Sequence, residues 1–199
     1  MIDNFKIFEK TVWTNHLLIV DVQEQFSQFF NDIYLEKLYE HAEMFSNVYQ
    51  IYDTIDSDKY SYQFPNQVKT ISKEYGGGEI QIKDANSYFT GETLENFLKI
   101  DNLEYLNDLE PGTNWKMNNG DYYYYIGGQT YNSIGHDWFI CSEKLYHFFT
   151  DIKSRNISLE VVGGAFMECL YDITTILDSL EIEYKLNDKF IYSYKGCKF

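Results

Sequence analysis

Residues His16–Val22 read HLLIVDV, an unbroken apolar run that carries one carboxylate, Asp21, near its end. Continuous rather than alternating apolar residues are typical of a strand that is buried on both faces of a parallel sheet. Two further segments, Val48–Asp53 and Ile157–Val162, are also predicted to be strands; the first again ends in an acid, and Gly163–Gly164 closes the second.

Helical patterns separate these strands. Ile33–Ser46 carries apolar residues at helical spacing (Ile33, Leu35, Leu38, Ala42 and Phe45), and Asp32 is available as its N-cap. Ser142–Lys153 and Cys169–Leu180 are also amphipathic with a helical period. Strands that alternate with helices imply right-handed crossovers. We therefore predict an α/β fold of three layers, with a mostly parallel central sheet and helices on both faces.

Shorter segments complete the expected sheet. Glu79–Lys83 follows three glycines and is a third strand candidate, and Ile182–Leu186 is the candidate for the last strand. Phe190–Tyr194 either extends that last strand or forms an edge. We expect one domain over residues 1–199, because no linker rich in Pro or Ser divides the chain.

The stretch 102–135 interrupts the alternation of strands and helices. It contains the turn sequence Asn118–Gly120 followed by the tyrosine run Tyr122–Tyr125. Asn-Gly beside residues that favour strands indicates a β-hairpin. We expect an insertion that contains a hairpin, whose tyrosines either cover the active site, form a subunit contact or serve as good strand formers.

The charge balance bears on partners. The chain has 31 acidic and 16 basic residues, a formal net charge of −15. Nucleic-acid binding needs a basic surface, so we expect no nucleic-acid partner. No apolar run reaches the roughly 20 residues of a membrane helix, and the N-terminus lacks the form of a signal peptide, so we expect no membrane partner.

The three cysteines are Cys141, Cys169 and Cys197. Their odd number and their spacing do not suit a disulfide framework, and none belongs to a CxxC pair. We therefore expect a reducing, cytoplasmic location. For Cys141 and Cys197 we expect structural or incidental roles.

Three reactive side chains fall at or after expected strands. Asp21 ends the first strand, Lys83 ends Glu79–Lys83, and Cys169 follows Ile157–Val162. In an open parallel sheet, ligands bind outside the carboxyl ends of the strands. The predicted topology therefore brings these three residues toward one site.

Cys169 is the candidate nucleophile. The N-terminus of a helix stabilises a thiolate, and a nearby Lys83 ammonium would lower the thiol pKa further. Asp21 would then accept the thiol proton and return it to a leaving amine, or activate water. Gly163–Gly164 permits unusual backbone geometry, so the amides of Ala165 and Cys169 are candidates for an oxyanion site.

Two segments resemble signatures of the isochorismatase-like cysteine hydrolases, a group that includes nicotinamidases. Leu17–Phe26 resembles the first signature, and Val161–Leu170 resembles the second, in which a strand and a short turn deliver the nucleophile. The resemblance implies hydrolysis of an amide-type C–N bond through a cysteine thioester, catalysed by Cys169, Asp21 and a lysine. It also makes Gln23 and Phe26 candidate substrate-binding residues. The turn before Cys169 reads Ala-Phe-Met-Glu, where members of the family commonly carry Thr and Asp or Asn.

The family's lysine has an aromatic residue six positions later and a leucine five beyond that. Lys83, Phe89 and Leu94 reproduce this spacing, but the distance from Lys83 to Cys169 is longer than in the family. The segment ending in Phe139 and Leu145 is an alternative without a suitable lysine. Lys116 is the other candidate and lies in the expected hairpin, so Lys83 is preferred.

Related nicotinamidases hold a metal with an Asp and several His. Asp53 occupies the corresponding place, but no histidine lies in Thr54–Gln67. We therefore expect no metal and no cofactor, which argues against nicotinamidase activity.

The sequence thus predicts a cysteine-dependent hydrolase of a small molecule. One alternative is a family member that has lost catalysis and serves as a binding or interaction module. Another is a vinyl-ether hydrolase that uses Asp21 as its acid. The resemblance also implies that the chain can form a homo-oligomer.

Overall fold

The centre of the molecule is a five-stranded sheet with the strand order β3-β2-β1-β8-β9. The computed structural model describes residues 14–53, 62–73, 87–89, 110–116, 122–131, 135–166 and 169–199. The sheet strands are β1 (His16–Val20), β2 (Asn47–Asp53), β3 (Gln67–Lys73), β8 (Leu159–Gly163) and β9 (Tyr184–Ile191). All four neighbouring pairs are parallel. The predicted α/β fold with a parallel central sheet is confirmed.

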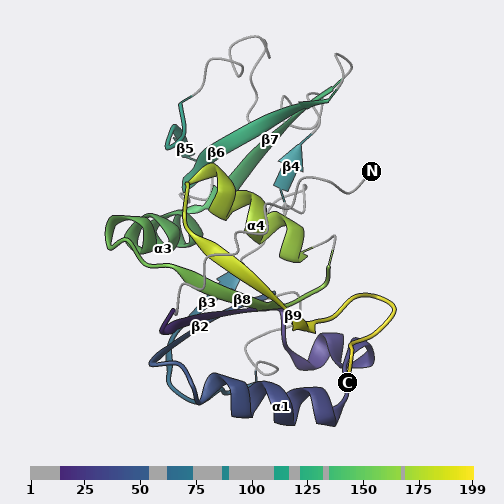
Figure 1. Cartoon of the computed structure of the whole chain (residues 1–199). Coiled ribbons are helices and arrows are strands. Elements are labelled where there is room, and N and C mark those ends of the chain that lie inside the picture. The colour runs from purple at the N-terminus through teal and green to yellow at the C-terminus, as the bar shows by residue number, and fades with distance from the viewer. Residues whose placement is uncertain are drawn as a thin grey trace.

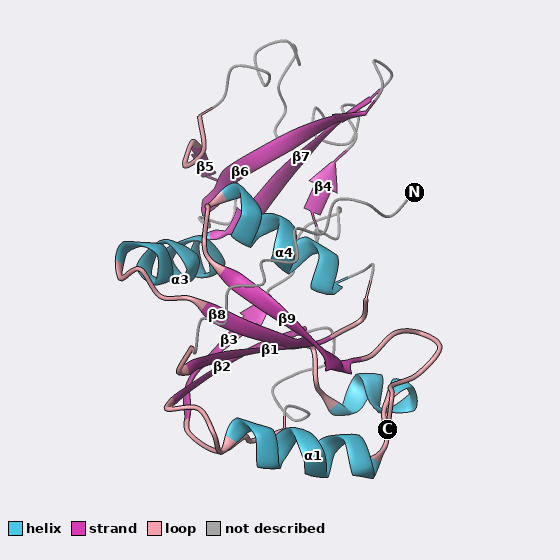
Figure 2. Ribbon diagram, viewed as in Figure 1, coloured by secondary structure: helices cyan, strands magenta, loops and turns pink. Residues whose placement is uncertain are grey.

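Helices cover both faces of this sheet (Figures 1 and 2). Helix α1 (Asp32–Ala42) lies on one face, and α3 (Glu143–Ser154) and α4 (Cys169–Ser179) lie on the other. A short 3-10 helix, η1 (Glu24–Phe29), follows β1. As the sequence predicts, α1 lies between β1 and β2, α3 precedes β8, and α4 lies between β8 and β9.

The start of α1 differs from the prediction in one residue. The N-cap is Asn31, not Asp32, because the backbone of Asn31 is extended and its side chain accepts a 2.9 Å hydrogen bond from the Tyr34 amide. Asp32 is instead the first helical residue, where a carboxylate favours the helix dipole. Ser142 caps α3 in the same way, with its side chain accepting from the Leu145 amide.

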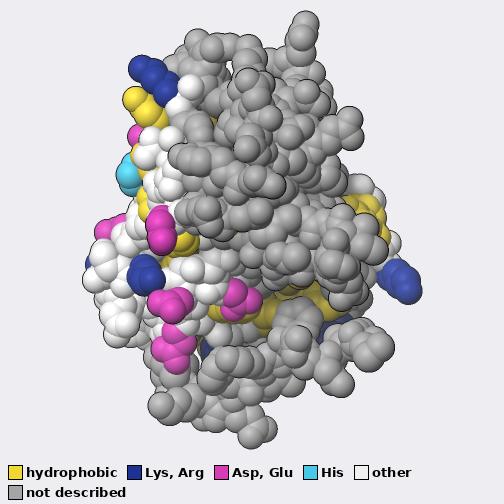
Figure 3. Space-filling model, turned by 90° about the horizontal axis from the view of Figure 1, so that it is seen from above, with side chains coloured by type: hydrophobic (Ala, Val, Ile, Leu, Met, Phe, Trp, Pro, Cys, Tyr) yellow, Lys and Arg dark blue, Asp and Glu magenta, His cyan; other side chains and the backbone are white. Residues whose placement is uncertain are grey.

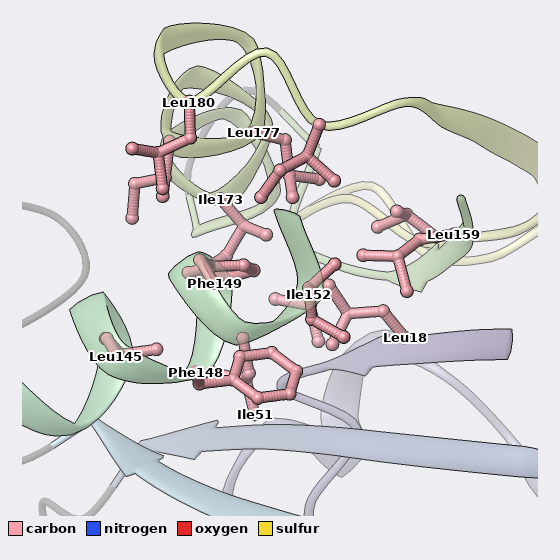
Figure 4. Packing of buried hydrophobic residues seen from close by; sticks show 14 of the residues in the cluster. Leu18, Ile51, Leu145, Phe148, Phe149, Ile152, Leu159, Ile173, Leu177 and Leu180 are labelled. Atoms are coloured by element: carbon pink, nitrogen blue, oxygen red, sulfur yellow. The ribbon is translucent and has the colours of Figure 1, made fainter. Parts of the chain in front are cut away.

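The larger core fills the space between the sheet and the pair α3 and α4 (Figure 4). Side chains from both helices meet alternate residues of the strands, such as Leu18 of β1 and Ile51 of β2. The labelled helix residues of this core are Leu145, Phe148, Phe149 and Ile152 from α3 and Ile173 and Leu177 from α4. Burial on this side and on the opposite side explains why the sequence of β1 is apolar from Leu17 to Val20.

The opposite face packs against α1. Leu17 and Ile19 of β1 point to this side, together with Leu38 of α1. Tyr34 is fully buried here, whereas Ile33 is 56% exposed, so the apolar face of α1 begins one residue later than predicted. The Tyr34 hydroxyl accounts for this orientation, because it donates a 2.9 Å hydrogen bond to the Phe190 carbonyl at the end of β9.

A second, antiparallel sheet has the order β4-β7-β6-β5. Its strands are β4 (Ser87–Phe89), β5 (Asn114–Lys116), β6 (Tyr122–Tyr131) and β7 (Gly135–Ser142). It lies on the far side of α3 and α4 from the parallel sheet (Figure 1). Because Ile126 of β6 and Cys141 of β7 belong to the larger core, this sheet is packed onto the helices rather than separate from them.

The predicted hairpin is present as β5 and β6, which pair antiparallel with Lys116 opposite Tyr122. Its turn sequence, Asn118–Gly120, lies outside the described residues. Tyr123 and Tyr125 are buried, while Tyr122 and Tyr124 are partly exposed. This alternation is that of a strand with one buried face, which accounts for the spacing of the tyrosines.

Two parts of the parallel sheet differ from the expectation. The strand beside β2 is β3, which the sequence did not predict, and the expected strand Glu79–Lys83 lies outside the described residues. The expected segments Ile182–Leu186 and Phe190–Tyr194 both contribute to one strand, β9, which begins at Tyr184 and ends at Ile191, so the second segment extends the first.

Charged side chains of both signs lie at the left of the view in Figure 3, the side on which α3 lies in Figure 1, and acidic side chains are the more numerous there. Among the described residues, no helix is long and apolar enough to cross a membrane.

Candidate functional site

The site predicted around Asp21 and Cys169 lies where the order of the parallel sheet reverses. From β1 the chain moves outward through β2 and β3, and it later returns to the other side of β1 to form β8 and β9. β1 and β8 are therefore neighbours whose connections leave in opposite directions, and the carboxyl ends of such strands define a crevice where ligands bind. Asp21 directly follows β1, and the turn to Cys169 follows β8.

Asp21 is fully buried and has a left-handed backbone, with φ of +52°. Its amide donates a 2.9 Å hydrogen bond to the carbonyl of Ile51, at the end of β2. Its own carbonyl accepts a 2.6 Å hydrogen bond from the hydroxyl of Tyr192, which follows β9. The peptide groups of Asp21 are thus held from both sides of β1, which fixes a backbone conformation that is costly for a residue other than glycine.

Cys169 is the first residue of α4 and is 9% exposed. The helix spans 11 residues, long enough for its aligned peptide dipoles to favour a negative charge at the N-terminus. The turn that delivers Cys169 is closed by a 3.3 Å hydrogen bond from the Leu170 amide to the Ala165 carbonyl. The expected position of Cys169, at the head of a helix after a buried strand, is the observed one.

Two glycines allow this turn to lie against β1. Gly163 has φ of +103°, and a Cβ at this position would lie 2.0 Å from the Val20 carbonyl oxygen. A Cβ on Gly164 would lie 2.8 Å from the ring of Tyr192. The Gly164 amide donates a 3.0 Å hydrogen bond to the Val20 carbonyl. The close approach of the turn to β1 therefore depends on the absence of side chains at both positions.

Ala165, proposed for the oxyanion site through its amide, is 5% exposed and follows a cis peptide bond with Gly164. Gln23 is 2% exposed, and its side-chain amide donates a 2.9 Å hydrogen bond to the Gln25 side chain. Phe26 lies in η1 and packs, partly buried, against the core on the α1 side. Gln23 therefore immediately precedes η1, the element that follows Asp21, and Phe26 lies within it.

The proposed lysine, Lys83, lies outside the described residues. The other candidate, Lys116, is exposed on β5, with its ammonium nitrogen 5.6 Å from the centre of the Tyr122 ring. Asp53, the candidate metal-binding acid, is the last residue of β2. Among the described residues, no group of three or more His, Cys, Asp or Glu side chains is arranged to hold a metal ion.

Tyr192 is a site residue that the sequence did not reveal. It is 1% exposed and contacts both halves of the site through Asp21 and Gly164. Burial, together with the negative charges of Asp21, Tyr34 and Cys169, raises the pKa of Tyr192 well above its usual value. The sequence pattern does not distinguish Tyr192 as a site residue, because a tyrosine in the stretch Phe190–Tyr194 is also a good strand former.

No protein-family model, curated protein or solved structure matches this chain.

Proposed function

We propose that this chain is a cytoplasmic, cysteine-dependent hydrolase that cleaves an amide-type C–N bond of a small molecule. The observation that carries the proposal is the placement of Asp21 and Cys169, which follow neighbouring parallel strands at the reversal point of the sheet. Both are buried; Asp21 is bonded across strands to Ile51, and the turn that leads to Cys169 is bonded to β1 through the Gly164 amide and the Val20 carbonyl. Buried reactive groups that converge at such a point are typical of catalytic sites.

The proposed reaction has two stages. Asp21 accepts the proton of Cys169, and the thiolate attacks the carbonyl carbon, so that a C–S bond forms and the C–N bond breaks. The protonated Asp21 returns its proton to the leaving amine. Water then attacks the thioester, with Asp21 taking one proton, and the C–S bond breaks to release the acid and regenerate the thiol.

Two features support Cys169 as the nucleophile. Its place at the first position of α4 stabilises the thiolate that the reaction requires. Negative charge on the tetrahedral intermediate would be held by the amides of Ala165 and Cys169 at the turn before the helix. Lys83 remains our proposed source of the ammonium that further stabilises the thiolate, and Gln23 and Phe26 remain the proposed contacts to substrate.

The first test measures the reactivity of each cysteine as a function of pH. The protein is treated with iodoacetamide across a pH series, and the modified fraction of each cysteine is read by peptide mass spectrometry. Cys141, which is fully buried in β7, and Cys197, which is partly exposed, are references in the same sample. We expect the midpoint for Cys169 to lie clearly below the ordinary thiol value of about 8.5. A midpoint at that value would refute an activated nucleophile.

The second test is catalytic. Release of ammonia or amine from a panel of small primary and secondary amides is measured for the wild type, Cys169→Ala and Asp21→Asn, with Cys141→Ala as the matched control. We expect both site variants to lose at least about a hundredfold in rate and the control to retain activity. Activity on a vinyl ether that survives Cys169→Ala and is lost in Asp21→Asn would instead indicate the Asp-dependent alternative.

A further inference from the structure

Tyr192 is bonded to both halves of the proposed site. Its hydroxyl donates a 2.6 Å hydrogen bond to the main-chain carbonyl of Asp21, a contact between residues 171 positions apart. Its amide donates a 3.1 Å hydrogen bond to the Gly163 carbonyl, and its carbonyl accepts a 2.9 Å bond from the Phe166 amide. One residue therefore contacts the proton acceptor and both ends of the glycine turn that leads to Cys169.

The ring of Tyr192 fills the space that Gly164 leaves open, with three of its carbon atoms 2.8 Å from an added Cβ there. On its other sides it packs against Phe30 at 5.3 Å and Tyr34 at 6.2 Å between ring centres. The ring is therefore held in place by packing, and the direction of its hydroxyl is set by the fold rather than by solvent.

The hydrogen bond reaches Asp21 where the backbone is left-handed. Asp21 has a left-handed φ of +52°, and its amide is already bonded to Ile51. Because the rotamers open to a side chain depend on the backbone that carries it, a bond to the carbonyl of Asp21 also restricts the directions open to its carboxylate. The raised pKa of Tyr192 keeps its hydroxyl protonated, so it remains a donor over the working pH range.

We infer that Tyr192 is a positioning residue that holds the Asp21 carboxylate in the orientation needed to take the proton of Cys169. The inference rests on the proposed function and adds to it a third residue, which acts through Asp21 and does not itself touch substrate. Precise support of a catalytic group by its neighbours is a general requirement of such sites, since small displacements reduce rates strongly.

The test uses Tyr192→Phe, which removes the hydroxyl and keeps the ring. The readout is the rate of alkylation of Cys169 by iodoacetamide across the pH series described above. We expect Tyr192→Phe to slow alkylation at pH 7 about threefold, the effect of losing one neutral hydrogen bond. Asp21→Asn should slow it further, and Tyr192→Phe should add nothing in the Asp21→Asn background, since residues that act through one group are not additive.

Tyr34→Phe is the matched control. Tyr34 is also fully buried, lies in the same aromatic cluster and donates its hydroxyl at 2.9 Å to a main-chain carbonyl, that of Phe190. We expect it to lower the melting temperature about as much as Tyr192→Phe and to leave the pH profile of Cys169 unchanged. A second variant, Gly164→Ala, displaces the ring of Tyr192 without removing its hydroxyl and should slow alkylation in the same direction.

The outcomes separate the inference from the proposed function. If Asp21→Asn slows alkylation while Tyr192→Phe matches the wild type, the positioning role is wrong and the hydrolase proposal stands. Equal effects of Tyr34→Phe and Tyr192→Phe, or additive effects of Tyr192→Phe and Asp21→Asn, would also overturn the positioning role. If Asp21→Asn itself has no effect on Cys169, both proposals fail.

Discussion

Gly163 makes the closest backbone approach in the site. Its φ of +103° lies in the region that favours glycine, and the Val20 carbonyl oxygen occupies the place where a Cβ would be. Gly196 has nearly the same φ, +105°, but the nearest atom to its added Cβ, the Phe29 carbonyl oxygen, lies 4.0 Å away. Replacing Gly196 with alanine therefore costs only an unfavourable backbone conformation, whereas replacing Gly163 adds a steric clash to that cost.

We predict that Gly163→Ala lowers the free energy of unfolding by more than about 3 kcal/mol, because both costs apply. Gly196→Ala should lower it by about 1 kcal/mol, the cost of backbone conformation alone. Urea unfolding followed by circular dichroism measures both. An equal loss in free energy of unfolding in the two variants would show that β8 can move away from β1 and relieve the clash at Gly163 without a measurable loss of stability.

At the scale of elements, a buried carboxylate links α1, β8 and β9. Glu160 of β8 is 3% exposed and accepts hydrogen bonds from His41 of α1 at 2.5 Å and Asn187 of β9 at 2.7 Å. The ammonium of Lys185, also in β9, lies 2.6 Å from its other oxygen. Burial raises the pKa of Glu160, but the hydrogen bonds from these three residues outweigh it and lower the pKa to about 2.

This network predicts a defined acid sensitivity. Because the pKa of Glu160 is lower in the folded state than its usual 4.5, its contribution to stability is complete above pH 4.5 and is lost as the pH falls toward 2. We expect Glu160→Gln to lower the free energy of unfolding at pH 7 by about 2 to 3 kcal/mol and to weaken its dependence on pH between 4.5 and 2.

The measurement is urea unfolding at a series of pH values. Glu181→Gln is the control, since the Glu181 side chain is 84% exposed and its ion pair with Lys153 is at the surface. If the free energy of unfolding falls equally in the wild type and in Glu160→Gln as the pH is lowered, Glu160 is not the source of the acid sensitivity.

The elements of the central sheet were predictable to the extent that their burial is two-sided. β1, β2 and β8 lie in the middle of the sheet and are rich in buried apolar residues, so their positions follow from the pattern even though β2 and β8 each contain a buried polar residue, Gln50 and Glu160. β3 is an edge strand with the polar sequence QVKTISK, and its Val68 is 54% exposed, so the same criterion misses it. The capping residue of α1 was missed by one position because Asn31 and Asp32 are both good caps.

The site was predictable in part for the same reason. Asp21 and Cys169 follow central strands, so the topology brings them to one edge of the sheet. Tyr192 follows an edge strand and acts through a main-chain carbonyl, a partner that no side-chain pattern in the sequence can indicate. The geometry of the turn at Gly163 likewise depends on how near β1 lies.

At the scale of the molecule, the two sheets share one core. Ile126 of β6 is 1% exposed and belongs to the same cluster as Leu18 of β1 and Ile173 of α4. Sheets that share one core in a small domain are expected to unfold together. Two of the three tryptophans, Trp115 and Trp138, are in strands of the antiparallel sheet, so their fluorescence reports mainly on that part of the chain.

We predict that unfolding followed by tryptophan fluorescence and by far-ultraviolet circular dichroism gives coincident transitions. Ile126→Ala should lower the free energy of unfolding by about 2 to 4 kcal/mol, and the two probes should report the same loss. The control Val68→Ala, at an exposed position of β3, should change the free energy of unfolding by no more than about 0.5 kcal/mol with either probe. A fluorescence transition that moves alone in Ile126→Ala would indicate that the antiparallel sheet unfolds independently.

The bond between Tyr192 and Asp21 also has a consequence for the synthesis of the protein. A ribosome that has added Asp21 must add 171 more residues before the hydroxyl that holds Asp21 exists. Contacts so distant in sequence form late, because most of the chain must be ordered before its ends can meet. The nascent chain therefore contains the Cys169 thiol before it contains the Tyr192 hydroxyl that positions Asp21. The proposed site becomes complete only when β9 has joined the sheet.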